Sequence, residues 1–291
     1  MKSLKESVVS VFGLGLLGGS LAWRLVETGR VRDVAGWSRN PATIAEAVER
    51  GVVTKGCSSA EECASLADVI VLAVPVRAME GLSLLIRGSA RKDVAVFDLG
   101  STKVEIGAVL SAIWGERYAG FHPMAGKERG GLENASPDLF LGSVCAVVPF
   151  PATRPEVASL AGELALALGG RPLKIDADEH DSAAACISHL PLVISAALSL
   201  LAGDEMENHP SLPALSAGGF RDTTRIAAGP AWLGADMVAG NGLQVRRLAE
   251  EFKRILDDLL SSPVAELESR LAAAAAARER ILSLKEERTR D

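Results

Sequence analysis

The stretch VVSVFGLGLLGGSLA, Val8 to Ala22, decides the fold of this chain. Its first residues form a short apolar run typical of a buried strand, and its last residues have the apolar spacing of a helix. Between them, Gly13, Gly15 and Gly18 stand in G-x-G-x-x-G spacing. Such glycines allow a tight turn, a close approach of backbone to a diphosphate, and close packing of helix on strand. The stretch therefore predicts a dinucleotide site at the N-terminus of a helix.

Apolar runs and helical segments continue to alternate after this stretch. Asn40 followed by Pro41 is typical of a helix start, and Gly29 and Gly51 stand where helices end. Alternation of this kind predicts a Rossmann-type, doubly wound parallel sheet over residues 1–177. The strands are expected at residues 8–13, 33–37, 69–75, 94–100, 143–150 and 171–176, and helices at 17–29, 41–51 and 154–170.

The strand signal stops near Asp178, and helical patterns follow at 179–202, 232–260 and 263–288. We therefore expect an all-helical domain over residues 178–291. The run AAACISHLPLVISAALSLLAG, residues 183–203, is long enough for a membrane span. Because it contains His189 and Pro191 and stands alone, a buried helix at a domain or subunit interface is favoured over a span.

Composition excludes several classes of protein. The 291 residues carry a net charge of −6 without a basic run, which argues against a nucleic-acid partner. Cys57, Cys63, Cys145 and Cys186 have neither metal-ligand nor disulfide-framework spacing, so no metal is expected and free thiols in a reducing cytoplasm are favoured. The first 15 residues lack the apolar stretch and cleavage site of a signal peptide. The expected location is the cytoplasm.

The end of the second predicted strand indicates which cofactor binds. NAD sites usually have Asp or Glu there, to bind the ribose hydroxyls. Here GWSRN places Ser38 and Arg39 instead, which suit a 2′-phosphate. NADP is therefore favoured over NAD, which remains possible; the alternative is a solvated surface arginine. The residues expected to contact the cofactor are Gly13, Gly15, Leu16, Leu17, Gly18, Ser38, Arg39, Thr43, Val74 and Pro75.

Three later segments carry polar groups that core packing does not require. DLGSTKVEI places Ser101 just past a strand end, where ligands lie in open α/β sheets. GFHPMAGKERGG, residues 120–131, reads as a glycine-rich loop around His122. SHLPLVISAALSLL puts Ser188 and His189 on an apolar helix, and GGFRDTTRIA follows at residues 218–227.

Together these segments resemble the prephenate/arogenate dehydrogenase family, the terminal oxidoreductases of tyrosine biosynthesis. The matching stretches are GLGLLGGSLA, DLGSTK, GFHPMAGKERGGLENASPDLF, ISHLP and GFRDTTRIA, in the family's order. The resemblance implies a small-molecule substrate, prephenate or arogenate. It also implies oxidative decarboxylation with hydride transfer to the nicotinamide, and a helical domain that forms a homodimer.

The resemblance also implies roles for individual residues. His122 would accept the proton of the ring hydroxyl, as a neutral imidazole can near pH 7, with Ser101 orienting that hydroxyl. Arg225 would bind the side-chain carboxylate, and Asp222 would hold the guanidinium. His189 and Ser188 match positions near nicotinamide and substrate; the alternative for His189 is a buried structural histidine. His180 and His209 match nothing and are interpreted as surface residues.

The chain departs from the family pattern at Leu192, where many prephenate-specific members have a second histidine, SHLPH. An apolar residue there, with a Ser-Arg pair after the second strand, is similar to NADP-dependent arogenate dehydrogenases. The preference between the two substrates stays open. Two rival interpretations are another two-domain reductase, of imine or β-hydroxyacid type, and a non-catalytic NADP-sensing module.

Overall fold

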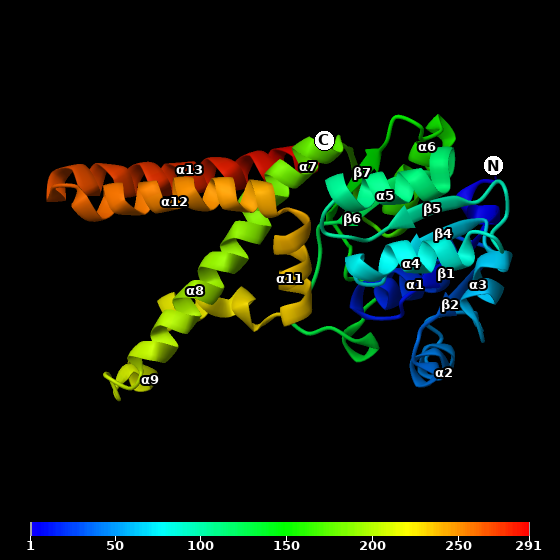
Figure 1. Cartoon of the computed structure of the whole chain (residues 1–291), viewed down its shortest axis with the longest axis horizontal. Helices are drawn as coiled ribbons and strands as arrows, with labels where there is room; N and C mark the ends of the chain where they lie inside the picture. Colours follow the sequence, from blue (N-terminus) through cyan, green and yellow to red (C-terminus); the bar gives the residue numbers. More distant parts are fainter. Residues whose placement is uncertain (1, 291) are drawn as a thin grey trace. The chain divides into compact units, whose positions relative to one another are not determined.

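The structure is a computed structural model that describes residues 2–290, with side chains as far as residue 284. Its centre is an eight-stranded sheet in the order β3-β2-β1-β4-β5-β6-β7-β8 (Figure 1). This order, with β1 beside β4, confirms the predicted Rossmann-type sheet. The strands are β1 Val8–Phe12, β2 Asp33–Trp37, β3 Lys55–Gly56, β4 Val69–Leu72, β5 Ala95–Asp98, β6 Tyr118–Pro123, β7 Val144–Pro149 and β8 Arg171–Lys174.

Helices cover both faces of the sheet because alternate strand residues point to opposite sides. Val9 and Val11 pack in one apolar cluster with α1, α2 and α6, whereas Val8 and Phe12 pack in a second cluster with α3, α4 and α5. Asn40 caps α2 by accepting a hydrogen bond from the Ala42 N–H at 3.0 Å. These helices are α1 Leu16–Thr28, α2 Pro41–Glu49, α3 Ala60–Leu66, α4 Val76–Ile86, α5 Val104–Trp114 and α6 Pro155–Ala167.

Three features of the sheet differ from the sequence prediction. The short strand β3 was not among the expected strands. The pair β6–β7 is antiparallel, although the other neighbouring strands, β7–β8 included, run parallel. In addition, His122 lies on β6, opposite Ala146 of β7, and not in a loop. The glycine and proline around His122 concealed the strand, because both residues are depleted in strand interiors. Its position on a strand holds the imidazole in a fixed place at the sheet edge.

The residues after β8 are helical, as predicted. A π-helical turn, Ala185–His189, joins α7 to α8 within one long helical stretch. A 3₁₀ turn, Arg225–Ala228, follows α10. The α-helices are α7 Ala177–Ala184, α8 Leu190–Glu205, α9 Leu212–Leu215, α10 Gly218–Thr224, α11 Ala231–Gly240, α12 Gly242–Ser261 and α13 Val264–Arg290.

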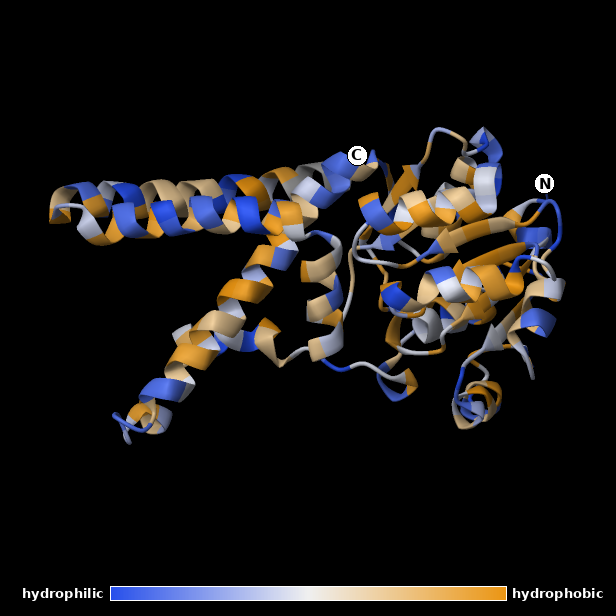
Figure 2. Cartoon of the chain, in the orientation of Figure 1, coloured by the Kyte–Doolittle hydropathy of each residue, from blue (hydrophilic) through white to orange (hydrophobic). Residues whose placement is uncertain are grey.

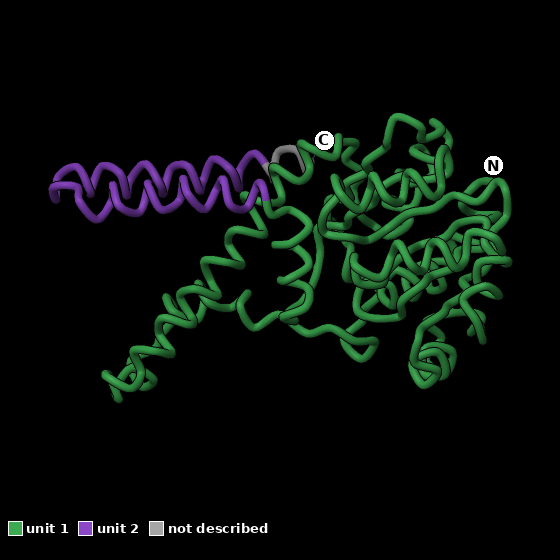
Figure 3. The backbone as a smooth tube through the Cα atoms, viewed as in Figure 1, with its two compact units in different colours: residues 1–242 green, residues 243–291 purple. Residues whose placement is uncertain are grey.

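The described chain divides into two compact units, residues 1–242 and residues 243–291 (Figure 3). The first unit contains the whole sheet and the helices through α11. The domain boundary expected at 177/178 stays a prediction. It lies close to the change from sheet to helices, since β8 ends at Lys174 and α7 begins at Ala177. The division into compact units, however, comes at residue 242.

The long apolar helix is not buried inside the chain. Figure 2 shows apolar residues along α8, and Ile187, Leu200 and Leu201 are 58–71% exposed. The helical stretch Ala177–Glu205 is long and apolar enough to cross a membrane by length and composition, with 28% of its most apolar window buried. A helix at a subunit interface has the same properties when one chain is viewed alone, so this single helix is weak evidence for a span.

Candidate active site

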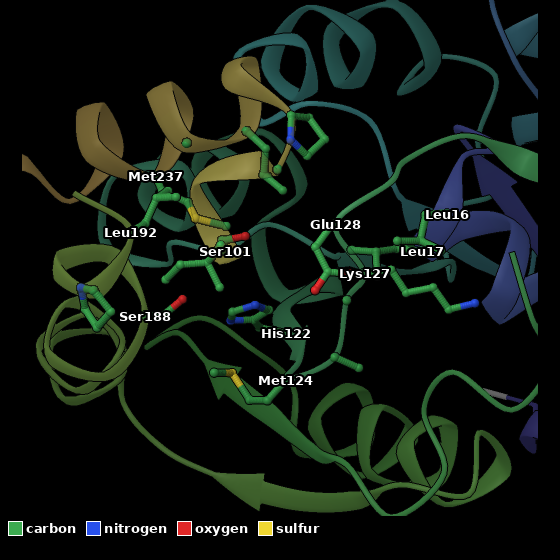
Figure 4. Close-up of a pocket in the computed structure, with 18 of the residues that line it drawn as sticks. Leu16, Leu17, Ser101, His122, Met124, Lys127, Glu128, Ser188, Leu192 and Met237 are labelled. Atoms are coloured by element: carbon green, nitrogen blue, oxygen red, sulfur yellow. The ribbon is translucent and has the colours of Figure 1, made fainter. Parts of the chain in front are cut away.

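A cavity of about 450 Å³ lies beyond the carboxyl ends of β1, β5 and β6, within the first unit. This size suits a small metabolite, and the position is where ligands bind in open α/β sheets. Figure 4 shows Ser101, His122 and Ser188 around the cavity, with Leu16 and Leu17 of α1 on its far side. The predicted residues that line it are Leu16, Leu17, Ser101, His122, Ser188 and Arg225.

A chain of hydrogen bonds runs from His122 to a buried carboxylate. His122 Nδ1 lies 2.9 Å from His180 Nε2, and His180 Nδ1 lies 2.7 Å from Asp181 Oδ1. The Asp181 carboxylate also accepts hydrogen bonds from the backbone N–H groups of Lys103 (2.8 Å) and Val104 (2.9 Å), where α5 begins. The helix N-terminus therefore stabilises Asp181 as an anion.

This chain assigns the protons on both imidazoles. An ionised Asp181 can only accept, so His180 carries its proton on Nδ1 and accepts at Nε2. His122 must then donate from Nδ1, which leaves its Nε2 as the nitrogen with a free lone pair. His122 thereby places a nitrogen that can accept a proton in the cavity wall.

The pKa of His122 lies well below its ordinary value, so the imidazole is neutral at pH 7. Burial is the main cause, and the charge of the nearby Lys103 lowers it further. A neutral imidazole is the form that can accept a proton. The electrostatic setting and the hydrogen-bond chain thus favour the same role.

The interpretation of His180 as a surface residue is wrong. Its side chain is 4% exposed, and it links His122 to Asp181. Polar residues near a helix start usually face solvent, which favoured the interpretation of His180 as a surface residue. A usable signal existed in the spacing: His180, Ala184 and Ala185 form a buried stripe that continues to His189. His209, by contrast, is exposed as expected.

Lys103 is a second residue that the sequence analysis did not assign. Its side chain is fully buried, and its Nζ donates to Asp98 Oδ2 at 2.6 Å and to the Gly100 carbonyl at 2.7 Å. Tyr118 donates to the other Asp98 oxygen at 2.7 Å. The paired ammonium remains close enough to His122 to lower the pKa of that imidazole.

Ser188 and His189 lie in the π-helical turn between α7 and α8. Such turns change the direction of side chains and occur often at functional sites. Ser188 lines the cavity, whereas His189 is fully buried, with its Nδ1 3.2 Å from the Asn241 amide nitrogen. Burial lowers the pKa of His189, although Asp181 nearby acts in the opposite direction. His189 thus lies behind the cavity wall in this structure, and its predicted catalytic role stays a prediction.

Arg225 lines the cavity from the start of its 3₁₀ turn. The carboxylate that its Nη1 contacts is Glu128, in the segment after β6. The expectation that Asp222 holds this guanidinium is therefore not met: Asp222 is exposed and, among the described residues, forms no ion pair with Arg225. Asp222 precedes Arg225 by about one helical turn, which suggested a contact between them. Glu128, which is distant in the sequence, provides the contact instead.

Apolar side chains form much of the remaining cavity wall. Leu192, the position of the expected second histidine, lines it together with Leu233 and Met237. A Cβ on Gly234 would lie 3.0 Å from Leu192 Cδ2, so this leucine packs closely against α11. The family's second histidine is thus replaced here by an apolar contact.

The glycine-rich turn has the geometry that a bound diphosphate requires. Gly13 has φ +99°, and a Cβ there would meet the Ala73 carbonyl oxygen at 2.5 Å, beside Val74. A Cβ on Gly18 would clash with Gly13, whereas a Cβ on Gly15 would meet no atom within 4 Å. The turn and helix packing therefore require the first and third glycines, and the second borders open space where a diphosphate fits. Pro75 follows Val74 and precedes α4.

The residues after β2 border a second cavity. Trp37, Ser38 and Arg39 line it together with α2 and the start of α3. The Arg39 guanidinium is exposed and contacts no carboxylate in the described part of the chain. Thr43 lies in the first turn of α2, where its N–H donates to the Asn40 carbonyl at 3.1 Å. Ser38 and Arg39 are thus both positioned beside the open space that follows β2.

No group of three or more His, Cys, Asp or Glu side chains that could hold a metal ion occurs in residues 2–284. The cysteines Cys57, Cys63, Cys145 and Cys186 are free thiols.

Residues 21–173 match the family described as "Prephenate dehydrogenase, nucleotide-binding domain". Residues 176–272 match "Prephenate dehydrogenase, dimerization domain". The chain belongs to the prephenate dehydrogenase family. Its sequence is 28% identical to the prephenate dehydrogenase of Lactococcus lactis over 86% of this chain and 70% of that protein.

Solved structures of the family have the same fold. Prephenate dehydrogenase from A. aeolicus, in complex with hydroxyphenyl propionate and NAD⁺, superposes with a TM-score of 0.88 at 29% identity, over 96% of this chain and all of that one. Synechocystis arogenate dehydrogenase superposes with a TM-score of 0.81 at 28% identity, over 94% of this chain and 99% of that one. The family therefore includes members named for each of the two substrates.

Proposed function

We propose that this protein catalyses the NADP-dependent oxidative decarboxylation of prephenate or arogenate. The observation that carries the proposal is His122: a neutral imidazole, held by His180 and Asp181, in the wall of a cavity that reaches Leu16 and Leu17 of the cofactor turn. A bound nicotinamide supplies the hydride acceptor. Loss of the ring carboxylate as carbon dioxide then makes the ring aromatic.

The residues around the cavity divide the remaining work. His122 Nε2 accepts the proton of the ring hydroxyl, and Ser101 donates a hydrogen bond that orients this hydroxyl. Arg225 binds a substrate carboxylate. Its Nη1 contacts Glu128, and its other guanidinium nitrogens have no partner among the described residues, so they can bind this carboxylate. Leu192, Leu233 and Met237 exclude water from the ring. Ser188 contacts the substrate from the cavity wall, and His189 lies buried behind that wall.

We propose NADP as the preferred cofactor. Ser38 and Arg39 stand directly after β2, where a carboxylate selective for NAD is usual, and both border an open cavity. A guanidinium can pair with a 2′-phosphate, and the Ser38 hydroxyl can donate to it.

A steady-state matrix of prephenate and arogenate against NADP and NAD tests the whole proposal. We expect turnover of at least one substrate and a higher kcat/KM with NADP. Arg39→Ala should reduce kcat/KM with NADP by about tenfold, equal to about 1.4 kcal/mol, and leave NAD turnover unchanged. Tight NADP binding without turnover of either substrate would show a cofactor-sensing module instead.

We also propose that the protein is a cytoplasmic homodimer. The exposed apolar residues of α8 support a subunit contact, and the free thiols are typical of a reducing compartment.

A further inference from the structure

The cavity combines a cation and an anion that touch one another. Arg225 Nη1 contacts Glu128 Oε1, and both side chains line the cavity that contains His122 (Figure 4 labels Glu128 and His122). Glu128 is the acidic side chain among the described lining residues. Its backbone N–H and Arg225 both lower the pKa of Glu128, so it is ionised at neutral pH.

A contiguous guanidinium and carboxylate match the charges of an α-amino acid. The Arg225 Nε and Nη2 atoms have no partner in the described part of the chain, so they can bind a carboxylate while Nη1 stays on Glu128. An ammonium on the carbon next to that carboxylate would then lie beside Glu128. A ketone at the same carbon offers Glu128 no hydrogen and no positive charge.

The net charge of the cavity lining also favours a substrate with an ammonium group. With His122 neutral, the charged lining residues are Lys127, Glu128 and Arg225, which sum to one positive charge. Arogenate, with two carboxylates and one ammonium, has a net charge that balances this. Prephenate lacks the ammonium, so its net charge of −2 exceeds the single positive charge of the cavity lining.

We propose that Glu128 binds the substrate ammonium and makes this protein selective for the amino-acid substrate, arogenate, over the keto acid prephenate. This inference rests on the proposed function and specifies its substrate. Arg225 binds the side-chain carboxylate, and Glu128 binds the adjacent ammonium.

Glu128→Gln tests the inference, because it keeps the size of the side chain and removes its charge. We expect kcat/KM for arogenate to fall about tenfold or more, and kcat/KM for prephenate to change by less than about threefold or to rise. Glu116→Gln is the matched control: Glu116 pairs with Arg154 at 3.6 Å and does not line the cavity. It should leave both values unchanged.

Binding of the two aromatic products provides a readout that does not depend on turnover. In the presence of NADP, Glu128→Gln should weaken L-tyrosine, which has the ammonium, and spare 4-hydroxyphenylpyruvate, which has the ketone. Equal losses for both substrates and both products would overturn the inference, since Glu128 would then act only by holding Arg225. No loss for either would overturn it as well.

The test also separates this inference from the proposed function. If the wild-type protein oxidises prephenate and not arogenate, the proposed function stands and the selectivity is wrong. If it oxidises neither, the proposed function fails, and the product affinities alone decide whether Glu128 recognises an ammonium.

Discussion

At the residue scale, Gly120 makes room for the buried side chain of Lys103 next to β6. A Cβ on Gly120 of β6 would lie 2.7 Å from Lys103 Cδ and 3.2 Å from Val148 Cβ. Lys103 cannot move away, because its Nζ is held by Asp98 and by the carbonyls of Gly100 and Thr102. The glycine therefore permits the buried ion pair that lies close to His122.

Gly120→Ala should destabilise the protein by about 1–3 kcal/mol, the usual cost of forcing an extra methyl into a filled core. Denaturant unfolding measures this difference. Gly81→Ala in α4 is the matched control, because a Cβ there meets no atom within 4 Å. It should be neutral or slightly stabilising, as alanine favours helices. Equal stability of Gly120→Ala and wild type would contradict the packing described for Lys103.

The sequence identified the residues that line the cavity better than those that support it. His122, Ser101, Ser188 and Arg225 were predicted from motifs, and the structure brings them to one cavity. His180, Asp181 and Lys103 were missed because polar side chains on a helix or turn usually face solvent, and for His180 this expectation outweighed its helical spacing to His189. Glu128 was missed as the partner of Arg225 because 97 residues separate the two.

At the element scale, the start of α7 positions the side chain that contacts His122. Asp176 caps α7 by accepting from the Glu179 N–H at 2.8 Å, and this places His180 and Asp181 one turn further, against β6 and α5. The doubly wound sheet was predicted from strand–helix alternation, although its strand order was not. The antiparallel pair β6–β7 was not, since the apolar pattern of a strand does not record its direction.

His180→Phe should lower kcat while it leaves KM for the substrate nearly unchanged, because His122 loses the group that fixes its tautomer. The acid limb of the kcat/KM profile reports the pKa of His122 in the free enzyme. That pKa is depressed, so activity persists below the ordinary imidazole value and is lost only as pH falls through the lower one. His180→Phe replaces the nitrogen that accepts the proton of His122 Nδ1 with an apolar ring, which stabilises the imidazolium less, so the acid limb should move to lower pH.

His209→Phe provides the control for this substitution, since His209 is exposed and outside the cavity. It should keep both kcat and the pH profile. An unchanged acid limb in His180→Phe would show that the hydrogen-bond chain does not set the protonation of His122.

At the scale of the whole molecule, α8 exposes an apolar surface of the kind that usually contacts another protein. Leu200 is 71% exposed and Leu201 is 58% exposed in the single chain. The match of residues 176–272 to a family dimerisation domain supports a second copy of this chain as the partner that contacts α8. The sequence predicted an interface helix here, and it could not show that the helix is exposed within one chain.

Light scattering should give a mass about twice the 30.4 kDa of one chain. Leu200→Glu should shift the protein towards monomer, because it places a charge in an apolar contact. Leu166→Glu, on α6 and 63% exposed, is the matched control and should stay dimeric. A wild-type protein that is monomeric at all concentrations would contradict the proposed subunit contact.

The role of His122 is tested most directly by the rate of reduced-nicotinamide formation in His122→Asn. Asparagine keeps a polar side chain of similar reach but cannot accept the hydroxyl proton. We predict a fall in kcat of about 10²–10⁴-fold, the usual contribution of a general base, with the NADP dissociation constant unchanged. Turnover within a few-fold of wild type would contradict the assignment of His122 as the catalytic base.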